Sequence, residues 1–283
     1  MPWASDMKSQ LENGHRSLLR PNSMIRSSGA GPRLLVSVRS QHEAERALAG
    51  GAEILDVKEP SFGSLGMAAF EDMAAIAGTP EISSRAIPLS VALGEVCDWP
   101  QQAKFFALPS HVSFAKLGLS QCARRTDWQT DWLRVRTEFE RQSLSELRWV
   151  AVAYADSTEA ISPSISDIMQ AAIETHCAGL LVDTWTKDGR TLLDEIDAMS
   201  LSAIADECHA AGLFLALAGR LNRDALQGLA NVPADVIAIR SAACHGIDRT
   251  SELDSTRVAE FRNEVRRWFG PTQVEPLGQR PPN

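Results

Sequence analysis

Three lysines and two aspartates stand in or just after short apolar runs, where they could act on a carbonyl compound. Asp56 and Lys58 end one such run, and Lys116 interrupts another. Asp183 ends a third run, and Lys187 follows it in the next loop. Because side chains alternate across a strand, Asp56 and Lys58 share one face, and their apolar neighbours share the other. The polar face is therefore expected to point into a site.

This combination of residue types suits Schiff-base chemistry. Neighbouring ammonium groups and partial desolvation lower the pKa of a lysine, so that a neutral amine can attack a carbonyl carbon. Aspartates beside such a lysine balance the remaining charge and relay protons. The ordinary alternative for each lysine is a solvated surface position, alone or in an ion pair. The chemical interpretation makes the following residues catalytic: Lys58, Lys116, Asp56, Asp183 and Lys187.

Eight short apolar or β-branched runs alternate along the chain with segments of helical periodicity. The expected strands are Arg33–Val38, Glu53–Lys58, Ile87–Leu93, Val112–Leu117, Arg148–Tyr154, Gly179–Asp183, Leu213–Ala218 and Val236–Arg240. The expected helices are Gln41–Ala49, Met67–Ala77, Trp128–Arg141, Ile165–His176, Leu192–Ala211, Arg223–Ala230 and Ser255–Trp268, with a further one around Trp99–Ala107. This alternation predicts parallel strands with right-handed crossovers, and eight units favour a closed (β/α)₈ TIM barrel over an open sheet.

The chain is long enough for one such α/β barrel with an extension at each end. It has 283 residues, and a (β/α)₈ barrel needs ~250. We expect a flexible extension over residues 1–32, a single catalytic domain over 33–269 and a flexible tail over 270–283. The extension lacks the continuous apolar segment of a signal peptide, and Met24 is an alternative start of translation.

Charge and cysteine usage exclude several classes of partner. The formal net charge of −8 argues against nucleic acid and anionic membranes as partners, and no apolar run is long enough to span a bilayer. The five cysteines form no CxxC pair, which is typical of reduced thiols in the cytoplasm. Adjacent His–Cys pairs lack the spacing of a metal site, so neither a metal nor an organic cofactor is expected. The sequence leaves open whether the chain forms a homo-oligomer.

A phosphate site is expected where the seventh and eighth strands end, because these barrels commonly bind phosphate there. Gly219 and Arg220 follow the seventh strand, and glycine lets backbone N–H groups approach an anion. Arg240, Ser241 and Ala242 follow the eighth, where an arginine could grip the phosphate. Arg220 has the alternative of being a surface residue. The expected partner is therefore a small phosphorylated aldehyde.

A glycine-containing segment, residues 63–66, follows the second strand. Its Gly-Ser-Leu-Gly sequence matches neither the dinucleotide-binding fingerprint nor the P-loop. We expect it to be a flexible loop over the mouth of the barrel.

These segments resemble, in order along the chain, the (5-formylfuran-3-yl)methyl phosphate synthases of furan-type C1 cofactor biosynthesis. The matching segments are Ala49–Pro60, Gly63–Gly66, Ala115–Gly118, Ala153–Asp156, Asp183–Thr184 with Lys187–Gly189, Ala216–Gly219, and Arg240–Cys244 with Asp248–Arg249. They span almost the whole expected barrel. Two positions depart from the family pattern, which usually has glycine in place of Ser241 and lysine in place of His245.

The resemblance implies an enzyme that condenses two molecules of glyceraldehyde 3-phosphate into a phosphorylated furan aldehyde, with loss of one phosphate and water. Lys58 is similar to the family's Schiff-base lysine, and Lys116 to its proton acceptor. Asp56, Asp183 and Lys187 are similar to its supporting residues. In bacteria the product would lead to a methanofuran-like carrier used in formaldehyde oxidation. The alternatives are another class I aldolase or phosphosugar lyase, and a phosphometabolite-binding barrel without catalysis.

Overall fold

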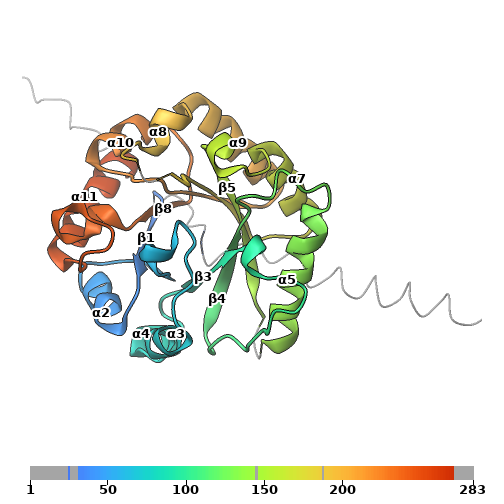
Figure 1. The fold of residues 1–283 in the computed structure, drawn as a ribbon. Coiled ribbons are helices and arrows are strands. Elements are labelled where there is room, and N and C mark those ends of the chain that lie inside the picture. The colour runs from blue at the N-terminus through green and yellow to red at the C-terminus, as the bar shows by residue number, and fades with distance from the viewer. Residues whose placement is uncertain (1–24, 26–30, 144–145, 187, 271–283) are drawn as a thin grey trace, which may run out of the picture.

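Eight parallel strands form a closed barrel in which each strand pairs with the next and β8 pairs with β1 (Figure 1). The computed structural model describes residue 25 and residues 31–143, 146–186 and 188–270. The strands are β1 (Arg33–Val38), β2 (Ile54–Val57), β3 (Leu89–Glu95), β4 (Val112–Gly118), β5 (Arg148–Tyr154), β6 (Gly179–Asp183), β7 (Phe214–Leu217) and β8 (Val236–Ile239). The closed parallel barrel expected from the sequence is therefore confirmed.

Helices surround this barrel on its outer side (Figure 1). The α-helices are α2 (Gln41–Ala49), α3 (Phe70–Ala77), α4 (Pro80–Ser83), α5 (Trp128–Gln142), α6 (Ser157–Ala160), α7 (Ile165–Glu174), α8 (Leu192–Glu195), α9 (Ala198–Ala210), α10 (Arg223–Leu229) and α11 (Ser255–Phe269). Short 3₁₀ turns are η1 (Pro60–Phe62), η2 (Val96–Asp98), η3 (Ser241–Ala243) and η4 (His245–Ile247). None of the described helices is long and apolar enough to cross a membrane.

Polar side chains before the first turn explain where several helices begin. Ser40 accepts a hydrogen bond from the backbone N–H of Glu43 at the start of α2, which satisfies a donor that the helix itself leaves unpaired. Asp197 does the same at the start of α9, through the N–H of Ser200 at 2.8 Å. This second cap divides the segment expected as one helix, Leu192–Ala211, into α8 and α9.

The helix expected around Trp99–Ala107 was wrong. Irregular chain follows η2 over these residues. Trp99 donates from its indole nitrogen to the carbonyl of Leu93 at 2.7 Å, and its ring stacks on Phe105 with centroids 4.9 Å apart. The Trp99 ring also meets Phe139 of α5 edge-on. Aromatic packing against the outside of the barrel therefore fixes this segment, and it does not need a helical backbone to bury its apolar side chains.

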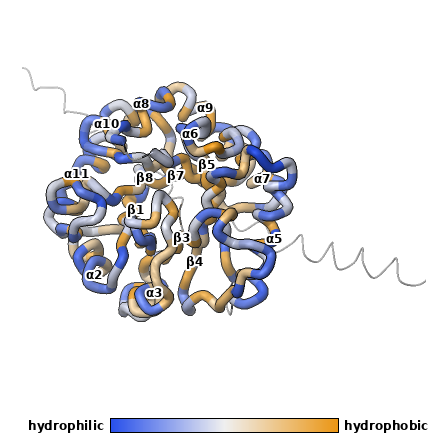
Figure 2. Tube along the Cα trace, in the orientation of Figure 1, coloured by the Kyte–Doolittle hydropathy of each residue, from blue (hydrophilic) through white to orange (hydrophobic). Residues whose placement is uncertain are grey.

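Strand residues alternate between an outer core under the helices and an inner core inside the barrel. In β2, Leu55 and Val57 belong to the outer core, whereas Ile54 belongs to the inner core and Asp56 lines a central cavity. Figure 2 shows apolar strands at the centre, with hydrophilic residues prominent on the surrounding helices. Ile25 also joins the inner core and is only 2 % exposed. The alternation expected from the sequence is confirmed, and it turns Asp56 inward.

Candidate active site

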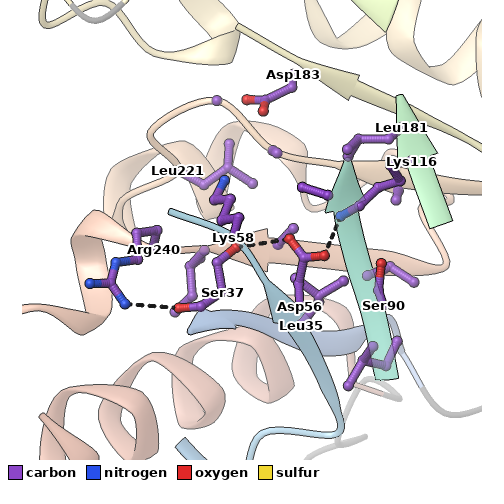
Figure 3. A pocket seen from close by; sticks show the side chains of 18 of the residues that line it. Leu35, Ser37, Asp56, Lys58, Ser90, Lys116, Leu181, Asp183, Leu221 and Arg240 are labelled. Atoms are coloured by element: carbon purple, nitrogen blue, oxygen red, sulfur yellow. Dashed lines mark hydrogen bonds and ion pairs between the residues drawn. The ribbon is translucent and has the colours of Figure 1, made fainter. Parts of the chain in front are cut away.

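A cavity of about 290 Å³ runs inside the barrel to the ends of the strands. Its deeper wall is apolar and includes Phe114 and Phe214, whose rings meet edge-on with centroids 5.7 Å apart. Its upper wall is polar, and Figure 3 shows the side chains gathered there. The polar residues that line it include Ser37, Asp56, Lys58, Ser90, Lys116 and Asp183. A small ligand with an apolar body and charged ends fits such a space.

Asp56 and Lys116 form a buried ion pair across the cavity. The ammonium nitrogen of Lys116 lies 2.6 Å from Oδ1 of Asp56, and the two residues are 5 % and 2 % exposed. Ser37 donates to the other carboxylate oxygen at 3.3 Å. Burial raises the pKa of Asp56, but the charges of Lys116 and Lys58 outweigh burial and hold this pKa below its usual value. Asp56 is therefore an anion at neutral pH.

Lys58 stands just beyond the end of β2 and reaches the cavity from the same face as Asp56. Its ammonium group donates to the carbonyl of Ser64 at 3.3 Å. Its charge also acts on Asp56, as the lowered pKa of that carboxyl shows. The two lysines that the sequence selected therefore line one cavity, and both of them act on the carboxylate of Asp56.

Asp183 ends β6 and faces the same cavity from another side of the barrel (Figure 3). It is 4 % exposed, and one of its oxygens accepts the backbone N–H of Thr184 at 2.8 Å. This hydrogen bond fixes the carboxylate at the strand end. Lys187, the remaining catalytic candidate, lies outside the described residues.

Gly219, Arg220 and Ser241 line the cavity where β7 and β8 end. Gly219 has φ of +98°, and an added Cβ would lie 2.9 Å from a methyl carbon of Thr184, so this turn needs glycine. Arg220 follows with φ of +50° and an exposed side chain. Among the hydrogen bonds of the described residues, none is donated by the backbone N–H of Gly219, Arg220, Ser241 or Ala242. These amides remain available to an anion.

Arg240 follows β8 and lines the cavity, but its guanidinium binds other groups of the protein. It is 7 % exposed, and its guanidinium donates to both carboxylate oxygens of Glu43 on α2. Its other N–H groups donate to the carbonyls of Ser37, Arg249 and Ser251 at 3.1, 2.8 and 3.1 Å. A guanidinium has five N–H donors, and these contacts occupy all of them. Contrary to the expectation from the sequence, this side chain has no N–H left for a phosphate.

Three further residues near the mouth were missed as site residues. Arg249, after η4, lines the cavity; its only sequence signal was a place in the matched Asp-Arg motif. Tyr154 at the end of β5 donates to Glu95 at the end of β3 at 2.6 Å. Burial raises the pKa of Glu95 above its ordinary value, against the lowering effects of Tyr154 and Ser120. No local pattern marks this pair, because its members come from different strands.

Within the described ranges, no group of three or more His, Cys, Asp and Glu side chains is arranged to hold a metal ion. The cavity holds the amines of Lys58 and Lys116 and the carboxylates of Asp56 and Asp183. Such groups can form an imine, exchange protons and balance charge.

The comparison with known families agrees with this arrangement. Residues 34–262 match the family described as 4-HFC-P synthase. The chain belongs to this family. The match covers β1 from its second residue, the other seven strands in full and the polar residues named above.

The chain also matches curated (5-formylfuran-3-yl)methyl phosphate synthases over nearly the full length of those proteins. The chain is 33 % identical over 233 residues to the (5-formylfuran-3-yl)methyl phosphate synthase of Methanobrevibacter smithii, covering 81 % of this chain and 97 % of that protein. The synthase of the same name from Methanothermobacter thermautotrophicus is 34 % identical over 233 residues, with the same coverage. The Methanocaldococcus jannaschii synthase is 32 % identical over 238 residues, again covering 81 % and 97 %.

Solved structures show the same fold at low sequence identity. Wild-type GGGPS from Thermoplasma volcanium gives a TM-score of 0.58 at 10 % identity, covering 90 % of this chain and 98 % of that one. The (S)-3-O-geranylgeranylglyceryl phosphate synthase of Thermoplasma acidophilum gives a TM-score of 0.53 at 13 % identity, covering 87 % and 96 %. At such low sequence identities the likeness to these structures shows a shared fold and nothing about function.

Proposed function

We propose that this enzyme condenses two molecules of glyceraldehyde 3-phosphate into (5-formylfuran-3-yl)methyl phosphate. The products that balance the reaction are one phosphate and two water molecules. Support comes from the full-length relatives that carry this name and from one observation in the cavity. Lys58 and Lys116 face the same space, with the carboxylate of Asp56 2.6 Å from the second amine.

In this proposal Lys58 forms an imine with the carbonyl carbon of the first substrate, and the carbonyl oxygen leaves as water. The imine makes the adjacent carbon acidic. Lys116 removes a proton from that carbon after passing its own proton to Asp56, and the resulting enamine attacks the second aldehyde. Elimination of phosphate, dehydration and ring closure then lead to the aromatic furan, and the C–N bond to Lys58 breaks, which releases the product and returns the free amine.

Asp183 is positioned in this scheme to exchange protons from the far side of the cavity, since it ends β6 opposite the lysines. Lys187 keeps the supporting role that the family resemblance gives it. The backbone amides of Gly219, Arg220, Ser241 and Ala242 are proposed to bind a substrate phosphate, as amides at these strand ends can.

Incubation of the purified protein with glyceraldehyde 3-phosphate tests the proposal directly. We expect furan absorbance to rise together with the concentration of inorganic phosphate, at one phosphate for each furan. Borohydride added during the incubation should inactivate the enzyme by reducing the imine. A different class I aldolase would be inactivated without forming a furan, and a barrel that only binds phosphometabolites would show neither change.

A further inference from the structure

Hydrogen bonds within the described part of the chain use only some of the N–H groups of the Arg249 guanidinium. Its Nη2 donates to the carbonyl of Gly63 at 2.6 Å. Its Nε is buried and, within the described part of the chain, has no hydrogen-bond partner. The residue lines the cavity together with its neighbour Asp248. A buried N–H donor without an acceptor is unfavourable, so an incompletely hydrogen-bonded guanidinium in the cavity wall is suited to an acceptor that arrives with a ligand.

Arg240 holds the backbone of Arg249 in this position. The Nε of Arg240 donates to the carbonyl of Arg249 at 2.8 Å, and its Nη2 donates to the carbonyl of Ser251 at 3.1 Å. Arg240 is itself anchored to Glu43 by a buried ion pair. These contacts hold the backbone of the loop that follows β8, and they fix the position from which the Arg249 side chain extends.

The burial of the Arg249 guanidinium also favours an incoming anion, although the carboxylates of Asp183 and Glu59 already act on it. Burial lowers the pKa of Arg249, and the positive charge of Arg240 acts in the same direction against the charge of Asp183. An anion beside the guanidinium would offset this desolvation. The adjacent backbone amides of Ser241 and Ala242 donate to no acceptor among the described residues, and Ser241 lines the cavity together with Arg249.

We propose that Arg249 binds the substrate's phosphate group through N–H groups that its hydrogen bond to Gly63 leaves free. This inference rests on the proposed function for the identity of the substrate, but not for the binding of phosphate. A guanidinium is suited to it because a planar fork of N–H groups matches the oxygens of a phosphate. Its place after β8 is where barrels of this type commonly bind phosphate.

The proposal gives residues 63–65 a defined role, and we call them the roof segment. The roof segment accepts hydrogen bonds from Arg249 at Gly63 and from Lys58 at Ser64. The hydroxyl of Ser64 donates to the carbonyl of Thr184 at 2.8 Å, and Leu65 is buried in the cavity wall. Phosphate bound by Arg249 would therefore stabilise the segment that orients the Lys58 amine.

The test compares Arg249→Gln and Arg249→Lys with a matched control, Arg223→Gln. Arg223 forms an exposed ion pair with Glu260 outside the cavity. For Arg249→Gln we expect kcat/KM with glyceraldehyde 3-phosphate to fall by about 10- to 100-fold, mainly through KM, as for loss of a charge-assisted hydrogen bond. The affinity for inorganic phosphate, measured by calorimetry, should fall similarly. Arg249→Lys should be intermediate, and Arg223→Gln should match the wild type.

Unphosphorylated glyceraldehyde separates phosphate binding from a general defect. Borohydride trapping of glyceraldehyde on Lys58 should be about as fast in Arg249→Gln as in the wild type, because no phosphate is involved. Unchanged phosphate affinity and unchanged KM in Arg249→Gln would overturn the proposal. Faster hydrogen exchange in the roof segment of Arg249→Gln, with unchanged phosphate affinity, would also overturn it, because Arg249 would then only stabilise the roof segment.

Two further outcomes keep the inference separate from the proposed function. If the wild type makes no furan, the proposed function fails, and the phosphate titration alone still tests Arg249. If Arg249→Gln does not fold, Arg249→Lys provides the comparison; equal phosphate affinity in this variant and the wild type would then contradict a specific guanidinium contact.

Discussion

The ammonium group of Lys116 and the carboxylate of Asp56 lie 2.6 Å apart in the interior of the barrel, on strands separated by β3. Each is almost fully buried. Removal of one member would leave the other as an unpaired charge in a poorly solvated place, which typically costs several kcal/mol. The pair is therefore both a candidate proton-transfer unit and a determinant of stability.

Asp56→Asn and Lys116→Met should each lower the free energy of unfolding by about 3–5 kcal/mol, because each leaves the other member of the pair as a buried, unpaired charge. The free energy of unfolding should fall less in the double variant than the two single losses add up to, since neither charge of the pair remains. Urea unfolding of the four proteins measures this coupling. Strictly additive losses would show that the two groups do not act as a pair.

Lys58→Arg should abolish furan formation and leave the fold intact, because arginine keeps the positive charge but cannot supply a neutral amine. Lys104→Arg is the control, since Lys104 is exposed and does not line the cavity. Borohydride reduction with substrate, followed by peptide mass analysis, should place the adduct on Lys58. An adduct on Lys187 would mean that Lys187 forms the imine and Lys58 has the supporting role. The absence of any lysine adduct under turnover conditions would contradict the imine mechanism.

Gly118→Ala should lower the free energy of unfolding by about 1–3 kcal/mol, as overpacking does. The added Cβ would lie 2.2 Å from a carboxylate oxygen of Glu95, and Lys116 stands only two residues before it on β4. Activity should fall as well. Gly78→Ala is the control because its Cβ would meet nothing closer than 3.4 Å. The loss should shrink in a Glu95→Ala background; an equal loss there would refute the steric explanation.

Glu95 should make a contribution to the stability of the wild type that falls as pH rises above 4.5. Burial raises the pKa of Glu95 above its ordinary value of 4.5, so the folded state holds a proton that the unfolded state releases first. The resulting stabilisation is complete below pH 4.5 and is lost as pH rises through the folded pKa. In Glu95→Gln this part of the decline should be absent. Urea unfolding at several pH values checks this, and an identical pH dependence in both proteins would contradict it.

Arg240→Lys should lower the free energy of unfolding by about 2 kcal/mol or more, because three ammonium donors replace five guanidinium donors in a buried network. Arg223→Lys should change stability by less than about 1 kcal/mol, since its ion pair with Glu260 is exposed. Thermal and urea unfolding compare the two. Similar small effects in both variants would remove the structural role assigned to Arg240.

The amino-acid sequence by itself determined the alternation of strands and helices and which face of a strand points into the barrel. Period-two alternation turned Asp56 and Lys58 to one side and Leu55 and Val57 to the other, because successive side chains of a strand point to opposite faces. It also indicated the chemistry, since lysines beside aspartates suit imine formation. It failed between β3 and β4, where packing of Trp99 on Phe105 and Phe139 fixes an irregular segment.

Only the tertiary structure decided which of these side chains meet. Asp56 pairs in register with Ser90 of β3, and the next inward position, Ala92, pairs with Lys116. These two small side chains leave room for a lysine and an aspartate to touch across the intervening strand. The structure likewise decided that Arg240 pairs with Glu43, 197 positions away, while Arg249 faces the cavity. Such contacts depend on barrel closure and strand register, which bring distant segments together and leave no trace in local periodicity.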